Sequence, residues 1–173
     1  MLDTTCILKR KRYPDGTVDK LKARLCVRGD QQEEGVDYFD TYTPVVQWGT
    51  VRFLLILAVY LGIATKQVDY TNAFVQSPKG TTAFIRHPRL FERIGYVLKL
   101  KRSVYGLHQS PKNFFQYLKE GHELRRWTES QIDPCLFYKK EMMCVCYIDD
   151  CIFFHPESKR IEEESVRLRL SDL

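Results

Sequence analysis

The tetrapeptide Tyr147-Ile148-Asp149-Asp150 places two adjacent carboxylates inside an otherwise apolar stretch. Apolar runs flank the pair on both sides, at residues 144–146 and 152–154. Two negative charges at the tip of a buried hairpin are unfavourable unless a cation meets them, and carboxylates are ligands that Mg²⁺ prefers. The pattern therefore indicates a divalent-metal site. On spacing alone, a hairpin turn whose aspartates simply face water is an equally good interpretation.

Asp69 is a third carboxylate of the same character, at the end of a predicted strand over residues 64–69. An aspartate at a strand end is by itself usually a turn former. Together with Asp149 and Asp150 it would complete a cluster that can hold two metal ions about 4 Å apart, one beside the attacking oxygen and one beside the leaving oxygen. Phosphoryl and nucleotidyl transfer require such a pair of metal ions.

The elements that must position these carboxylates follow from turn signals and apolar periodicity. Pro14-Asp15-Gly16 predicts a turn within a β-hairpin over residues 5–29. A helix is predicted from Thr50 to Leu61, ended by Gly62, and its nearly uniform apolar character predicts full burial. Ser110-Pro111 is typical of a second helix start. Further strands are predicted at 83–85, 96–100, 136–139, 143–148 and 151–154, with a charged helix at 157–170. The expected fold class is α+β.

The chain of 173 residues carries a net charge of +5, concentrated near its start. A basic balance suits a polyanionic partner without requiring one. The first group comprises Lys9, Arg10, Lys11, Arg12, Lys20, Lys22, Arg24 and Arg28, and the second comprises Lys99, Lys101 and Arg102.

Six cysteines occur without any C-x-x-C pair, and no signal peptide is visible. This usage is typical of a reduced, intracellular protein. A zinc site from Cys144, Cys146 and His155 is the alternative, but alternating strand positions favour burial of these thiols as small apolar groups. The longest apolar run, 53–64, is shorter than the roughly 20 residues that span a bilayer, so no membrane partner is expected.

Residues 147–150 are similar to the Y-x-D-D box of reverse transcriptases, and five further segments resemble boxes of copia-type LTR retrotransposons in the same order. These segments are 21–29 (LKARLCVRG), 36–46 (VDYFDTYTPVV), 68–74 (VDYTNAF), 103–111 (SVYGLHQSP) and 133–137 (DPCLF). Each box is weak alone, but six collinear boxes are specific. The chain thus resembles the reverse transcriptase domain of a copia-type Pol polyprotein.

This resemblance implies a right-hand polymerase fold, with fingers and palm built on a mixed, mostly antiparallel sheet with packed helices. It implies that residues 1–173 form one such domain, cut before the thumb. The implied activity is RNA-directed DNA polymerisation, in which a primer 3′-hydroxyl attacks a deoxynucleoside triphosphate. By family role, Asp69, Asp149 and Asp150 are the catalytic carboxylates and bind two Mg²⁺ ions, or Mn²⁺ in their place.

The resemblance also implies substrate contacts near the start of the chain and after Asp69. Lys22 and Arg24 lie on the fingers strand expected to hold the triphosphate, and the resemblance does not say which of them touches it. Phe74 occupies the place of an aromatic that excludes a 2′-hydroxyl. The alternatives without substrate contact are that the two cations lie on a solvated strand face and that Phe74 packs in the core.

Tyr105, Gly106 and Gln109 fall in the segment that is expected to line the nucleotide and template pocket. Gln109 could equally be a surface polar residue near a helix start. The sequence departs from the family here, because His108 stands where a lysine is usual. This departure removes no carboxylate.

The implied partners are a primed RNA or DNA template, deoxynucleoside triphosphates, and the integrase and RNase H domains of a parent polyprotein. The implied location is cytoplasmic, in a virus-like particle. Two rival functions stay open: a catalytically inactive nucleic-acid-binding remnant of such an element, and a two-metal nuclease, which the copia-like boxes do not support.

Overall fold

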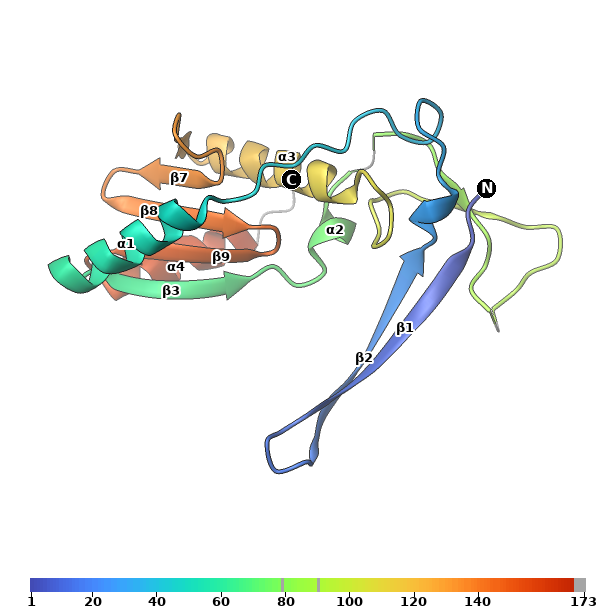
Figure 1. Ribbon diagram of the computed structural model, residues 1–173, viewed down its shortest axis with the longest axis horizontal. Coiled ribbons are helices and arrows are strands. Elements are labelled where there is room, and N and C mark those ends of the chain that lie inside the picture. Colours follow the sequence, from blue (N-terminus) through green and yellow to red (C-terminus); the bar gives the residue numbers. More distant parts are fainter. Residues whose placement is uncertain (79, 90, 170–173) are drawn as a thin grey trace. The chain divides into compact units, whose positions relative to one another are not determined.

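The computed structural model describes residues 1–78, 80–89 and 91–169, and it divides the chain into two compact units (Figure 1). The first unit combines residues 1–42 with 74–114, and the second combines 43–73 with the chain from Phe115 onward. Helices and antiparallel strands alternate along the chain, so the predicted α+β class is confirmed. No helix in the described ranges has both the length and the apolar character needed to cross a membrane.

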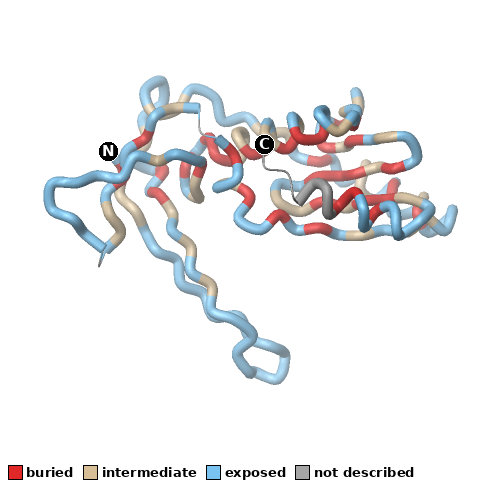
Figure 2. The backbone as a smooth tube through the Cα atoms, turned by 180° about the vertical axis from the view of Figure 1, so that it is seen from behind, coloured by how far each residue is buried: buried red, intermediate tan, exposed pale blue. Residues whose placement is uncertain are grey.

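The first unit begins with the predicted hairpin, β1 (Thr4–Arg12) and β2 (Val18–Val27), which pair in antiparallel register. At the predicted turn, the Asp15 carboxylate accepts hydrogen bonds from the Thr17 backbone N–H and hydroxyl. Most residues of both strands are exposed (Figure 2), so the hairpin presents most of its basic side chains to solvent, whereas Lys22 and Arg24 are partly buried.

A small core closes the base of this hairpin. Leu2, Val27, Ile85 and Leu107 are buried together. Ile85 belongs to β4 (Phe84–Ile85), which pairs with β5 (Leu98–Lys99), so both predicted strands are present but shorter than expected. The short elements η1 (Gly29–Gln31) and α2 (Ala73–Gln76) were not predicted.

The second unit is a five-stranded antiparallel sheet in the order β3-β9-β8-β7-β6. Its strands are β3 (Ala64–Asp69), β6 (Thr128–Glu129), β7 (Leu136–Lys139), β8 (Met142–Tyr147) and β9 (Asp150–His155). Four of the five were predicted to within a residue or so at their ends, and the two-residue β6 was not predicted.

Helices cover both faces of this sheet (Figure 1). On one face, α1 (Trp48–Leu61) packs Leu54 and Ala58 against a cluster that includes Val145 and Phe154. On the other face lie α4 (Ser158–Arg169) and the part of α3 (Ser110–Leu124) from Phe115 onward. Successive strand residues point to opposite faces, so the two helical layers contact alternating side chains.

The predicted full burial of α1 is wrong. Leu54 and Ala58 are buried, whereas Phe53, Ile56 and Val59 are 64%, 69% and 85% exposed. The helix forms an outer layer over the sheet, so only one stripe of its surface has the sheet beneath it. The helix also begins at Trp48, with Gln47 rather than Thr50 as its N-cap, and Gly62 ends it as predicted.

Candidate functional site

The three predicted metal-binding carboxylates all belong to the second unit, and the strand pairing brings them together. Asp69 is the last residue of β3, and it lies directly opposite Asp150, the first residue of β9. Asp149 sits in the two-residue turn between β8 and β9, and its backbone carbonyl accepts a 2.8 Å hydrogen bond from the N–H of Tyr70. The β3–β9 pairing thus continues into the turn.

Like charges face each other at this edge of the sheet. Directly opposed side chains on antiparallel strands interact, and two carboxylates in such a pair repel each other. Gln67, two residues before Asp69 and on the same face, donates a 3.1 Å hydrogen bond from Nε2 to Oδ1 of Asp150. Within the described residues, no lysine or arginine forms a salt bridge with Asp69, Asp149 or Asp150. Oxygen ligands with uncompensated charge suit a hard divalent cation.

The turn that carries Asp149 is strained. Ile148 has a φ of 54°, in the left-handed region. This conformation is a genuine outlier for a β-branched residue, and such strain persists only where the surrounding structure imposes it. Here the Tyr147–Asp150 pair closes a two-residue hairpin loop. Such loops require a positive φ at the first central position. The pairing of β8 with β9 therefore overrides the preference of isoleucine for a negative φ, and it does so at the residue next to Asp149.

In the first unit, three of the predicted substrate-binding residues contact one another. The guanidinium carbon of Arg24 lies 5.1 Å from the centroid of the Tyr105 ring, and that ring lies 4.8 Å from the ring of Phe74. Lys22 is two residues before Arg24 and on the same face of β2, so their Cα atoms lie roughly 7 Å apart along the strand. Phe74 is half-buried, and it also contacts Phe114 edge to face.

Gly106 is placed by a close approach of two backbone segments. Its φ is 94°, and a Cβ atom on it would lie 2.0 Å from the carbonyl oxygen of Val27. The same crossing leaves no room for a Cβ on Gly29, which would lie 2.0 Å from the carbonyl oxygen of Gly106. Glycine at both positions lets the chain after β2 pass against the segment that carries Tyr105. The Val27 N–H then donates to the Tyr105 carbonyl at 2.8 Å.

Gln109 is not a surface residue, since it is only 5% exposed. Its Oε1 accepts a 3.0 Å hydrogen bond from Nε2 of Gln32, and its Nε2 donates to the backbone carbonyl of Asp37 at 3.3 Å. The Oε1 of Gln32 accepts from the backbone N–H of His108. The amide of Gln109 therefore ties residues 32–37 to the segment before α3.

Asp133 was recognised only as part of a family box, and its structural role was missed. It is fully buried, and its carboxylate accepts 3.0 Å hydrogen bonds from the backbone N–H groups of Gln47 and Cys135. The first bond satisfies a donor at the start of α1, which explains the early N-cap. Only its position just before a strand could have indicated such a role.

Comparison with known proteins identifies the family of the chain. Residues 2–171 match the family described as Reverse transcriptase (RNA-dependent DNA polymerase). The chain is 29% identical over 154 residues to the Retrovirus-related Pol polyprotein from transposon TNT 1-94 of Nicotiana tabacum, covering 84% of this chain and 12% of the relative. It is 31% identical over 153 residues to the corresponding polyprotein from transposon RE1 of Arabidopsis thaliana, covering 84% and 10%.

A yeast relative matches a longer part of the chain. The Transposon Ty1-ER2 Gag-Pol polyprotein of Saccharomyces cerevisiae is 29% identical over 166 residues, which cover 89% of this chain and 8% of the relative. The chain thus spans about a tenth of the length of these polyproteins. Because the family match covers nearly all of the sequence, the chain belongs to the reverse transcriptase family, and its relatives are the Pol polyproteins of copia-type retrotransposons.

Proposed function

We propose that this chain is the fingers-and-palm part of an RNA-directed DNA polymerase from a copia-type retrotransposon. The observation that carries the proposal is the pairing of Asp69 with Asp150, with Asp149 on the adjoining turn, in a chain of the reverse transcriptase family. The second unit, an antiparallel sheet with helices on both faces, corresponds to the palm. The β1–β2 hairpin of the first unit corresponds to the fingers.

In the proposed reaction the three carboxylates hold two Mg²⁺ ions. The donor set fits, since these are oxygen ligands at the edge of a sheet with no bound lysine or arginine among the described residues. The ions would lower the pKa of the primer 3′-hydroxyl and neutralise charge on the triphosphate. The chain's own contribution is positional: the β3–β9 ladder fixes Asp69 against Asp150, and the Gln67 amide orients the Asp150 carboxylate.

The nucleotide-binding roles fall to residues of the first unit. Arg24, held against the Tyr105 ring, is the better candidate of the two β2 cations to meet the triphosphate, because an aromatic contact orients its guanidinium. Lys22, two residues nearer the hairpin turn, would add a second positive charge. Phe74 would exclude a 2′-hydroxyl with its ring edge, and Tyr105 would hold that ring in place at 4.8 Å.

Primer extension tests this function. The 173-residue chain is incubated with a primed RNA template, deoxynucleoside triphosphates and Mg²⁺, and the primer length is measured. Extension that depends on Mg²⁺ and is reduced by at least about a hundredfold in Asp149→Asn is the expected result. The matched control is Asp19→Asn, which removes an exposed carboxylate from β2. Undiminished extension by Asp149→Asn would contradict the assignment of the carboxylates.

A nucleic-acid-binding remnant without polymerase activity is the second candidate, and the exposed basic hairpin favours it. The hairpin is rich in lysine and arginine. This candidate predicts binding of primed template that weakens steeply as salt rises, with no extension at any protein concentration. Gel-shift titrations at several salt concentrations, run beside the extension assay, separate the two functions.

A further inference from the structure

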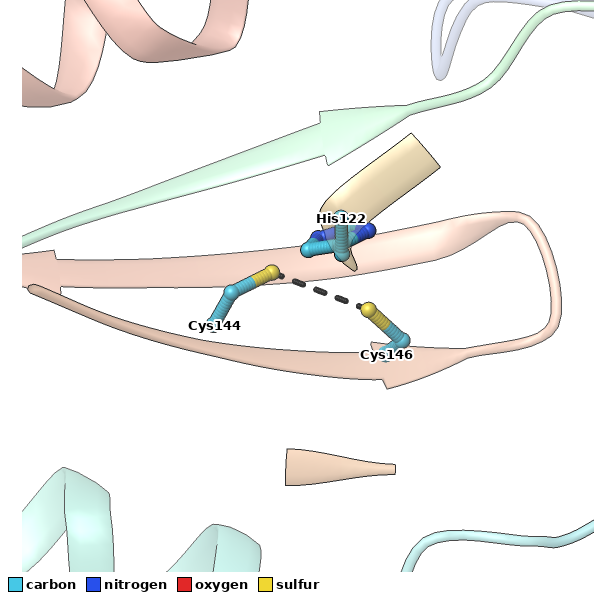
Figure 3. Close-up of side chains that lie close together, drawn as sticks. All are labelled: His122, Cys144 and Cys146. Carbon is cyan, nitrogen blue, oxygen red and sulfur yellow. Dashed lines mark hydrogen bonds between the residues drawn. The ribbon is translucent and has the colours of Figure 1, made fainter. Parts of the chain in front are cut away.

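A buried group of one imidazole and two thiols lies under the sheet of the second unit. His122 and Cys144 are fully buried and Cys146 is 2% exposed. One ligand atom from each lies within 4.8 Å of the other two. Figure 3 shows His122 beside both sulfur atoms of the strand β8. The zinc alternative considered from the sequence used His155 and was less favoured than burial of the thiols; the structure places His122, not His155, beside them.

The hydrogen bonding of His122 leaves one ring nitrogen for a ligand. Its Nδ1 lies 2.8 Å from the backbone carbonyl of Leu118, to which it donates. Its Nε2 is buried and has no hydrogen-bond partner within the described part of the chain. The ring is also fixed by stacking on Phe137, with centroids 4.6 Å apart. An imidazole whose Nδ1–H is bound to a backbone carbonyl presents Nε2 as a lone pair, which is how metal-binding histidines are oriented.

The two sulfur atoms of β8 already lie at a spacing typical of metal thiolates. Cys144 and Cys146 project from the same face of β8, and their Sγ atoms are 3.6 Å apart. In a tetrahedral zinc site, ligands about 2.3 Å from the metal lie about 3.7 Å from one another. Cys151 faces Cys146 across the β8–β9 pair, and its Sγ atom lies 3.1 Å from the Sγ atom of Cys146.

We propose that His122, Cys144 and Cys146, with Cys151 as the fourth ligand, form a structural binding site for Zn²⁺. Thiolate and imidazole ligands select a soft or borderline cation such as zinc, whereas the carboxylates of the catalytic group select a hard one. Each thiol that binds loses its proton to solvent. A set of three sulfurs and one nitrogen closes the tetrahedron, so the site has no open position for catalysis.

The site would act on the neighbouring turn. Cys151 follows Asp150 directly on β9, so its side chain points to the opposite face of the sheet from that carboxylate. Zinc bound there would fasten α3 to β8 and β9 at the residues next to the Ile148-Asp149 turn. It would stabilise the strained conformation of the turn from the face of the sheet opposite the carboxylates, without contacting them.

Two metal measurements on the whole 173-residue chain test the site. The chain is purified with reductant, excess Mg²⁺ and no chelator, and bound zinc is counted by elemental mass spectrometry. The expected result is a single equivalent of zinc. After the zinc is removed, Co²⁺ should give a thiolate-to-cobalt charge-transfer absorption that saturates at a single equivalent and disappears on adding Zn²⁺. Carboxylates give no such absorption, so the catalytic group cannot produce it.

Variants assign the ligands. His122→Gln preserves volume, and Cys146→Ala removes the central sulfur; each should weaken zinc binding by at least about tenfold. The matched control is Cys135→Ala, which deletes a buried thiol that packs with Val145 and Phe154 and does not belong to the group. The proposal is overturned by a folded wild-type chain without zinc or the cobalt absorption. It is also overturned by equal zinc retention in all variants, or by a Cys146–Cys151 disulfide in the freshly purified chain.

Discussion

Asp69 and Asp150 lie directly opposite each other on neighbouring antiparallel strands, with their side chains on the same face of the sheet. A cross-strand pair of like charges destabilises a sheet, yet here the pair sits where β3 and β9 end and begin. Within the described part of the chain, only the Gln67 amide, which donates a 3.1 Å hydrogen bond to Asp150, offsets the repulsion directly. The fold therefore holds a locally unfavourable pair at the position where a divalent cation would make it favourable.

The first prediction concerns Asp150→Asn. In the absence of divalent ions, this substitution should raise the free energy of unfolding by about 0.5–1 kcal/mol, because it removes the cross-strand repulsion. The wild-type chain should gain stability on adding Mg²⁺, because a ligand that binds only the folded state stabilises it. The variant should gain little. Urea unfolding with and without Mg²⁺ measures both effects.

The control for this experiment is Asp19→Asn, which changes the net charge equally at an exposed site in the first unit. Its response to Mg²⁺ should equal that of the wild type. If Asp150→Asn is destabilised without metal, or responds to Mg²⁺ as fully as the wild type, the carboxylates do not form a shared cation site.

The second prediction concerns the strained turn. Ile148→Gly should raise the free energy of unfolding by up to about 1 kcal/mol, since glycine adopts a φ of 54° without steric penalty. Ile148→Val retains a β-branched side chain and should give no such gain. Equilibrium urea unfolding of both variants distinguishes relief of strain from loss of side-chain contacts. A glycine variant less stable than the valine variant would show that Ile148 packing outweighs its backbone strain.

Much of the fold was predictable because its elements carry local signals. Strands β3 and β7 end where the apolar pattern changes, and Gly62 stops α1 as predicted. The burial of α1 was not predictable, because an all-round apolar helix gives no sign of which stripe will meet the sheet. The helix start at Trp48 also depends on Asp133, which lies 86 residues beyond Gln47 in the sequence.

The grouping of Asp69, Asp149 and Asp150 was predicted from a family resemblance rather than from their local pattern. Nothing in the sequence near Asp69 pairs it with Asp150, and the antiparallel register that does so is a tertiary feature. The same holds for His122, which contributes to no box. It approaches Cys144 and Cys146 only because α3 packs on the sheet.

The third prediction concerns the buried carboxylate of Asp133. Asp133→Ala should lower the free energy of unfolding by about 2–3 kcal/mol, because two buried backbone N–H groups, those of Gln47 and Cys135, would lose their acceptor. Asp133→Asn keeps one amide oxygen and should lose less. Urea unfolding monitored by circular dichroism provides the comparison, and equal stability of all three proteins would contradict the structural role of Asp133.

The fourth prediction concerns the close approach at Gly106. Gly106→Ala should lower the free energy of unfolding by more than about 2 kcal/mol, since its Cβ would lie 2.0 Å from the Val27 carbonyl oxygen and the φ of 94° disfavours any side chain. Gly80→Ala is the control, because a Cβ there meets nothing within 4 Å. Thermal unfolding of the two variants should separate them clearly, and similar midpoints would contradict the crossing of the two segments.

The fifth prediction follows from the burial of Cys135. Burial raises the pKa of its thiol to about 12, and the neighbouring Asp133 carboxylate adds to this effect. In the unfolded chain the thiol ionises near its ordinary value of 9.0. Between these two values the folded state binds more protons than the unfolded state. Stability is therefore fully present below about pH 9 and falls as pH rises toward 12, by at most about 1.4 kcal/mol per pH unit.

Urea unfolding between pH 8 and roughly 11 measures this slope, within the range that the thiol pKa values set. Cys135→Ala should make the decline shallower, because alanine does not ionise in either state. Cys6→Ala is the matched control, because it removes an exposed thiol from the hairpin. Other buried thiols contribute to the wild-type slope, so the informative quantity is the difference between the two variants. Parallel declines in Cys135→Ala and Cys6→Ala would mean that the pKa of the Cys135 thiol is no higher in the folded chain than in the unfolded chain.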